Sequence, residues 1–131
     1  MKRDTINNIN ILGIDWGKKK IGLAIADGIL ADPYGIIDSD NWEMKISKIC
    51  EENKIEKIVI GVSEAQSGQE AKDFGSKLGS LTEIPIVYFD ETLTTYDALV
   101  KMKEGKSKKQ DEDAIAAAII LQNYIDSQNY V

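Results

Sequence analysis

The sequence contains no histidine, one cysteine and only two prolines among its 131 residues. Without histidine, Ser-His-Asp and Cys-His nucleophile systems are excluded. Zinc sites built from histidine and cysteine are excluded too, because one thiol cannot fill a tetrahedral shell. The single cysteine, Cys50, also rules out a disulfide within the chain, which agrees with a reducing cytoplasm. Any catalysis therefore depends on carboxylates, lysines, hydroxyl groups or a cofactor.

Long apolar runs and overall basicity are absent as well. No stretch approaches the roughly 18 consecutive apolar residues of a membrane-spanning helix. The polar start MKRDTINN lacks the apolar core of a secretory signal. The formal net charge of −6 argues against a non-specific nucleic-acid binder, although it allows a local basic patch. We therefore expect a soluble, cytoplasmic protein with a single domain over residues 1–131, of which residues 1–8 form a flexible N-terminus.

The first third of the chain has the alternating pattern of β-strands. Ile9–Asp15 and Lys20–Asp27 are separated by the short Lys18-Lys19 link, which predicts a hairpin. A third strand is expected over Tyr34–Ile37. One face of the second strand carries only small residues, namely Gly22, Ala24 and Ala26. Another element is therefore expected to pack tightly against that face.

The rest of the chain alternates between helical spacing and short apolar runs. Helices are expected from Trp42 to about Asn53 with a cap at Asp40, from Ser67 to about Leu81, from Thr94 to Met102, and from Asp111 to Ser127. Buried strands are expected at Lys57–Gly61 and Ile86–Phe89. Cys50 falls on an apolar helical face, so we expect it in the core. The order β-β-β-α-β-α-β-α-α predicts an α/β fold with a mixed sheet and helices on both of its faces.

Three carboxylates occupy positions that suggest chemistry. Asp15 and Glu91 each follow an apolar strand, and Asp113 lies in the acidic start of the last helix. Each has an ordinary structural explanation when taken alone: Asp15 as a turn aspartate, Glu91 as a solvated charge, and Asp113 as a favourable charge at the start of a helix. Together they could meet at the sheet edge where parallel strands end. Such a cluster would bind Mg²⁺ or Mn²⁺, and two ions roughly 3.5–4 Å apart would suit phosphodiester hydrolysis.

Lysines gather beside two of these acids. Lys18, Lys19 and Lys20 occupy the first hairpin turn, next to Asp15. A second tract precedes Asp113 and includes Lys106, Lys108 and Lys109. Either tract alone reads as solvated lysines, but both together favour contacts with nucleic-acid phosphates, which position a substrate without reading its sequence.

Four segments in order resemble one protein family. They are ILGIDWGKKKIGLAIAD, KIVIGV, YFDETLTT and DEDAIAAAIILQNYID, and they extend from about Ile11 to Asp126. The set resembles the YqgF family of pre-16S ribosomal RNA nucleases, which are related to Holliday-junction resolvases. The resemblance implies an RNase H-like fold, in this chain a mixed five-stranded sheet of three antiparallel and then two parallel strands.

The resemblance also implies metal-dependent phosphodiester hydrolysis. Asp15, Glu91 and Asp113 match the family's catalytic, metal-binding acids, with Asp15 bridging two Mg²⁺ or Mn²⁺ ions and water attacking phosphorus in line. The implied substrate is the 5′ end of precursor 16S rRNA, with branched DNA as the alternative. Ribosomal precursor particles are the implied partners, no membrane is involved, and the protein is expected to be a monomer or a homodimer.

The chain departs from the family pattern at three places. Thr92 and Lys20 each stand where the family usually has arginine, and the loop after Gly61 is contracted. A threonine cannot make the bidentate phosphate contact of an arginine. Thr92 favours a non-catalytic nucleic-acid or ribosome-assembly factor as an alternative. Two other functions also stay open: a Holliday-junction resolvase, and a sugar-kinase-like or actin-like ATPase, whose phosphate motif also opens with Asp-x-Gly on a hairpin. Chain length argues against the ATPase, since those enzymes close two lobes over the nucleotide.

Overall fold

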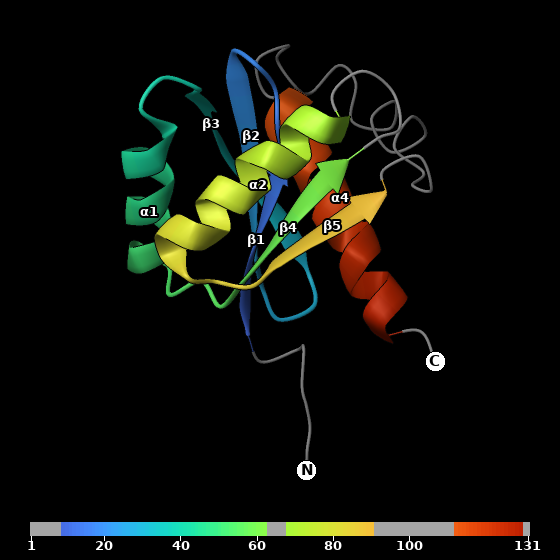
Figure 1. Cartoon of the computed structure of the whole chain (residues 1–131). Coiled ribbons are helices and arrows are strands. Elements are labelled where there is room, and N and C mark those ends of the chain that lie inside the picture. The colour runs from blue at the N-terminus through green and yellow to red at the C-terminus, as the bar shows by residue number, and fades with distance from the viewer. Residues whose placement is uncertain (1–8, 63–67, 91–111, 130–131) are drawn as a thin grey trace.

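A computed structural model describes residues 9–62, 68–90 and 112–129 of the chain (Figure 1). Several predicted features lie outside these ranges: residues 1–8, Glu91 and Thr92, the helix at 94–102, and the lysine tract before Asp113. None of the described helices is long and apolar enough to cross a membrane. The elements are β1 (Asn10–Asp15), β2 (Lys20–Asp27), β3 (Ala31–Asp38), α1 (Trp42–Glu52), β4 (Lys57–Val62), α2 (Gly68–Thr82), β5 (Ile86–Asp90) and α4 (Glu112–Asn129).

The five strands form one mixed sheet in the order β3-β2-β1-β4-β5. β1 and β3 each pair antiparallel with β2, whereas β1, β4 and β5 run parallel to one another. The predicted hairpin and the predicted mixed sheet are both confirmed. The three parallel strands end at the same edge of the sheet (Figure 1). Asp15 is the last residue of β1 and Asp90 the last residue of β5, so both lie at that edge.

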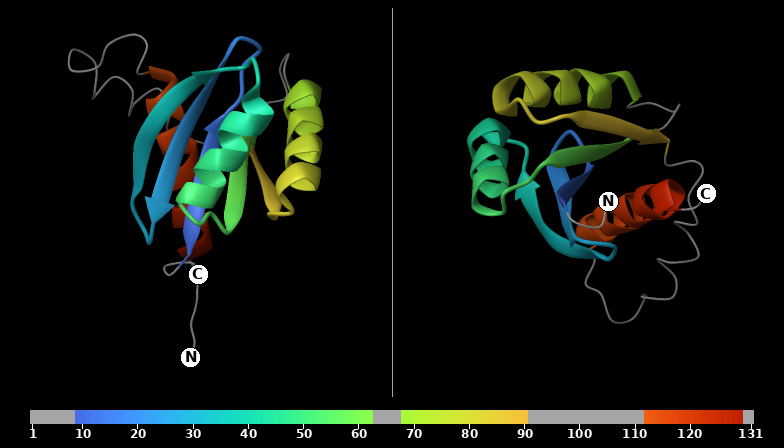
Figure 2. Two further views of the ribbon diagram at one scale, coloured as in Figure 1. Left: turned by 90° about the vertical axis from the view of Figure 1, so that its left-hand side faces the viewer. Right: turned by 90° about the horizontal axis from the view of Figure 1, so that it is seen from below.

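Helices cover both faces of the sheet, as predicted (Figure 2). Alternate residues of β1 point to opposite sides: Leu12 and Ile14 pack in a core with α1 and α2, and Ile11 packs in a second core with α4. Cys50 lies in the first of these cores, as its apolar helical position predicts. Two apolar layers thus hold the sheet between α1 and α2 on one side and α4 on the other.

The small residues of β2 are explained by the close approach of α4. Ala24 and Ala26 are fully buried in the core beneath this helix. β1 contributes to the same contact, since a Cβ atom placed on Gly13 would lie 2.7 Å from the Cβ of Leu121. The prediction that another element packs tightly on this face is confirmed, and the element is α4.

The main differences from the sequence prediction lie at the start of β3 and before α1. β3 begins at Ala31 rather than Tyr34, because Ala31, Asp32 and Pro33 also pair with β2. Pro33 is tolerated there because β3 is an edge strand, and the register shifts at Leu23/Ala24. The predicted cap at Asp40 is wrong. Asn41 precedes α1 in the left-handed conformation at φ 57° without a side-chain cap. The carbonyl of Ser39 instead accepts a bond from the Trp42 N–H at 3.3 Å.

Burial should make the Cys50 thiol unreactive in the folded protein. Only 5% of the residue is exposed, and burial raises the pKa of its thiol to about 11. The thiolate is the reactive form, so at pH 8 a disulfide reagent should label Cys50 in urea but not in buffer. Because the folded state holds the proton more tightly, the free energy of unfolding should fall as pH rises from about 9 to 11. Rapid labelling of the native protein would contradict this.

Candidate active site

Asp15 stands on a rigid turn between β1 and β2. It is the half-buried last residue of β1, followed by Trp16 and Gly17. The indole of Trp16 packs on the ring of Phe74 in α2, with the ring centroids 6.2 Å apart. A Cβ atom on Gly17 would lie 2.7 Å from the carbonyl oxygen of Lys20, so the turn is too tight for any other residue. The backbone that carries Asp15 is therefore held on both sides.

Asp113 lies close to the end of β1, although it is almost a hundred residues from Asp15 in the sequence. It lies in the first turn of α4, where a negative charge is favoured by the helix dipole. Gly22 is the residue of β2 that pairs with Asp15. A Cβ atom on Gly22 would collide with the backbone carbonyl of Asp113. The start of α4 thus rests on the strand position beside Asp15.

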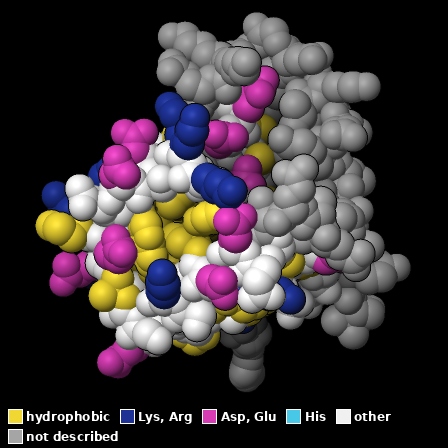
Figure 3. Space-filling view, turned by 45° about the horizontal axis from the view of Figure 1, so that its top comes forward, with side chains coloured by type: hydrophobic (Ala, Val, Ile, Leu, Met, Phe, Trp, Pro, Cys, Tyr) yellow, Lys and Arg dark blue, Asp and Glu magenta, His cyan; other side chains and the backbone are white. Residues whose placement is uncertain are grey.

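A cavity of about 360 Å³ opens where these two segments meet. Its lining combines two of the predicted acids with two of the predicted lysines. The lining residues are Asp15, Trp16, Gly17, Lys19, Lys20 and Asp113. Figure 3 views the molecule obliquely from this end, where basic and acidic side chains lie close to one another. A cavity lined by both carboxylates and lysines can hold a cation and a phosphate together.

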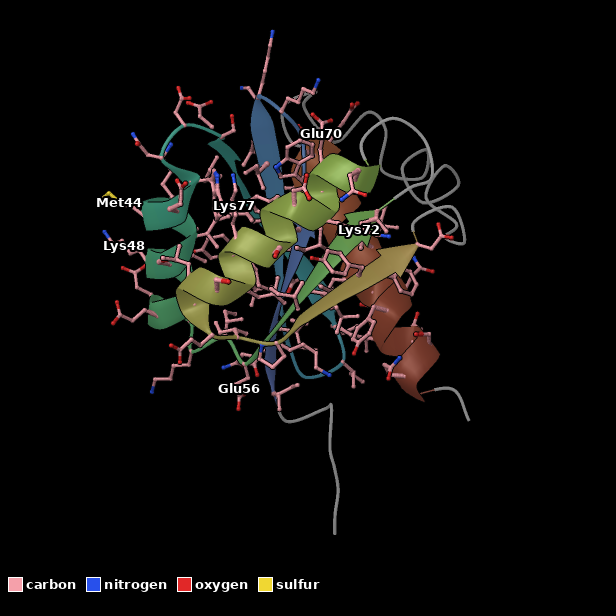
Figure 4. All side chains as sticks on the ribbon, in the orientation of Figure 1. Met44, Lys48, Glu56, Glu70, Lys72 and Lys77 are labelled. Atoms are coloured by element: carbon pink, nitrogen blue, oxygen red, sulfur yellow. The ribbon has the colours of Figure 1, made fainter. Side chains whose placement is uncertain are left out.

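The third lysine of the turn is directed elsewhere. Lys18 lies 3.7 Å from the carboxylate of Glu70, in the first turn of α2. Figure 4 shows Glu70 at the same end of the molecule as the β1–β2 turn. Both side chains are largely exposed, so the ion pair adds little stability. Lys18 is therefore near the cavity without lining it.

The donor atoms available in the cavity suit a hard divalent cation. Asp15 and Asp113 offer carboxylate oxygens, the ligands that Mg²⁺ and Mn²⁺ prefer. Within residues 9–62, 68–90 and 112–129, no group of three His, Cys, Asp or Glu side chains forms a metal site. Glu91, the third predicted ligand, follows the end of β5 and lies outside these ranges, and so do Lys106, Lys108 and Lys109. Two of the three predicted ligands are brought together.

Ser39 holds the lysine turn beside the cavity, and it was not predicted from the sequence. Its hydroxyl donates to the Lys18 carbonyl at 2.6 Å, and its N–H donates to the Lys19 carbonyl at 2.9 Å. No local motif marks this serine. Only the register that pairs Lys20 with Asp38 places the following residue, Ser39, against the turn. That register could be inferred from sequence only if the bounds of β3 were known.

Comparisons with known proteins identify relatives over nearly the whole chain. A family model described as "RuvX: Holliday junction resolvase" matches residues 9–127. Two similar proteins bear the name "Putative pre-16S rRNA nuclease". The one from Caldanaerobacter subterraneus subsp. tengcongensis is 38% identical, covering 92% of this chain and 98% of its own. The one from Lactococcus lactis subsp. cremoris (strain SK11) is 34% identical, covering 89% and 94%.

Solved structures support the fold. RuvC of T. thermophilus in complex with a Holliday-junction substrate aligns with a TM-score of 0.63 over 91% of this chain and 96% of that one. A second Thermus thermophilus RuvC structure aligns with a TM-score of 0.57 over 94% and 98%. The sequence identities are 14% and 11%, so these likenesses concern the fold alone. The predicted RNase H-like fold is thereby confirmed.

Proposed function

The chain belongs to the RuvX family, the YqgF nucleases of the RNase H-like superfamily, and from that membership we propose that it is a metal-dependent endonuclease. The reaction is hydrolysis of a phosphodiester bond. One observation carries the proposal: Asp15, Asp113, Lys19 and Lys20 surround a single cavity, although the two acids are far apart in sequence.

The residues of the cavity divide into two roles. Asp15 and Asp113, together with Glu91, would hold one or two Mg²⁺ or Mn²⁺ ions through carboxylate oxygens. When bound, such an ion offsets the negative charge and polarises the scissile phosphate. Lys19 and Lys20 bind the flanking phosphates and hold the strand in place. Lys18, Lys106, Lys108 and Lys109 extend this contact along the substrate.

We propose precursor 16S rRNA, cut near its 5′ end, as the substrate, in keeping with the names of the relatives at 38% and 34% identity. Ribosomal precursor particles would then be the partners. The whole chain, residues 1–131, would act as one nuclease domain, as a monomer or a homodimer, and a cytoplasmic location stays a prediction. A Holliday junction is the second candidate substrate, favoured by the description of the family model.

Direct competition between the two substrates tests this proposal. Purified protein in Mg²⁺ is offered a labelled pre-16S leader RNA and a four-way DNA junction at matched salt, because electrostatic affinity depends steeply on salt. We expect cleavage of the RNA and little cleavage of the junction. Preferential cutting of the junction would assign a resolvase. Binding of either substrate without cleavage in Mg²⁺ or Mn²⁺ would contradict a nuclease and favour the assembly factor that Thr92 suggests.

A further inference from the structure

Ser39 donates hydrogen bonds to two successive carbonyl groups of the lysine turn. The hydroxyl bonds the Lys18 carbonyl at 2.6 Å, and the backbone N–H bonds the Lys19 carbonyl at 2.9 Å. The second bond continues the β2–β3 ladder, which any residue other than proline would allow. The first requires a side-chain donor of short reach at position 39. Ser39 also accepts the Trp42 N–H, so the turn is tied through one residue to the start of α1.

The hydroxyl bond holds the turn at the point where the three lysines begin to point to different places. Lys19 and Lys20 line the cavity with Asp15 and Asp113, whereas Lys18 lies 3.7 Å from Glu70 on α2. In a turn, the orientation of each peptide plane sets the directions of the side chains on both sides of it. Holding the Lys18 carbonyl fixes the plane between Lys18 and Lys19. That plane lies between the lysine directed to α2 and the first lysine of the cavity.

We propose that Ser39 is a positioning residue for phosphate binding, which directs Lys19 and Lys20 into the cavity by holding the turn that carries them. This inference rests on the proposed nuclease function and adds to it a residue outside the cavity lining. Ser39 is not among the residues that line the cavity. Its removal should therefore weaken binding of nucleic acid and leave the chemical step unchanged.

The substitution Ser39→Ala removes the hydroxyl bond and keeps the bond made by the N–H. We expect the Kd and the KM for leader RNA to rise about fivefold, the ratio that corresponds to the loss of one hydrogen bond of ~1 kcal/mol. The kcat should stay the same. The slope of log Kd against log salt should fall by roughly 0.7–0.9, the loss of about one phosphate contact. Ser39→Thr, which keeps the hydroxyl, should bind as the wild type does.

Ser127→Ala is the matched control, because the Ser127 hydroxyl also donates to a carbonyl, that of Tyr124 at 2.7 Å, and lies on α4 outside the cavity lining. It should leave the Kd and the salt slope unchanged. Binding of a fluorescent leader RNA is measured for all variants, and Ser39→Cys, with a weaker donor of similar size, serves if the alanine variant misfolds. Wild-type affinity and salt slope in the alanine variant, or in the cysteine variant where the alanine variant misfolds, would overturn the positioning role alone. A wild-type protein that binds neither RNA nor junction would overturn the proposed function and this role with it.

Discussion

The substitution Asp15→Asn is expected to abolish cleavage while leaving the fold intact. Asparagine keeps the size of the side chain but removes the charge from one of the two described carboxylates of the cavity. Loss of ~4 kcal/mol of charge stabilisation corresponds to about a thousandfold lower kcat. Initial rates on leader RNA in Mg²⁺ measure this loss. A variant as active as the wild type would remove Asp15 from the site.

A second readout separates cation binding from catalysis. A ligand that binds only the folded state raises the thermal midpoint, so Mn²⁺ should stabilise the wild-type protein and stabilise Asp15→Asn much less. Asp27→Asn is the matched control, because Asp27 is an exposed aspartate that ends a strand at the opposite end of the sheet, where it pairs with Asn10. It should change neither the rate nor the response to Mn²⁺.

The substitution Gly22→Ala is expected to damage stability and activity together. The new methyl group would collide with the carbonyl of Asp113, which belongs to a backbone and cannot rotate away. Overpacking of this kind should lower the free energy of unfolding by about 3 kcal/mol, which is roughly 10 °C in the thermal midpoint. If the start of α4 moves by about 1 Å, kcat should fall about a hundredfold through misplacement of Asp113.

Gly35→Ala provides the control for this substitution. Gly35 also lies in a strand of the sheet, and a Cβ atom there would meet nothing within 4 Å. Its replacement should preserve both the thermal midpoint and the cleavage rate. Equal midpoints and equal rates for Gly22→Ala and the wild type would mean that α4 does not rest on β2 as closely as the structure places it.

Sequence alone predicted a mixed sheet and the close packing of another element on one face of its second strand. The alternation in Lys20–Asp27, with glycine and alanine on one face, indicated close packing there, and α4 occupies that face. Hairpin spacing predicted the pairing of β1 with β2, and the order of the elements predicted a mixed sheet. These features are local or periodic, so they are visible without coordinates.

The details of the site depend on contacts that no local pattern contains. Each of the three acids in the segment DED would interact favourably with the helix dipole. Only the family resemblance distinguished Asp113 from its neighbours. The division of the lysine triplet depends on Ser39, which is brought to the turn by strand register. The capping prediction at Asp40 failed for a related reason, because the chain enters α1 through a left-handed residue and a backbone bond.

The position of α4 has a consequence for how the protein is made. This helix packs on one face of the sheet and carries Asp113, yet it is translated after all five strands. Until it emerges from the ribosome, residues such as Ile11 and Val59 remain uncovered, and the cavity lacks half of its acids. A growing chain therefore has no complete acid pair. Under the proposed function, the new chain cannot cleave precursor rRNA until α4 has folded onto the sheet.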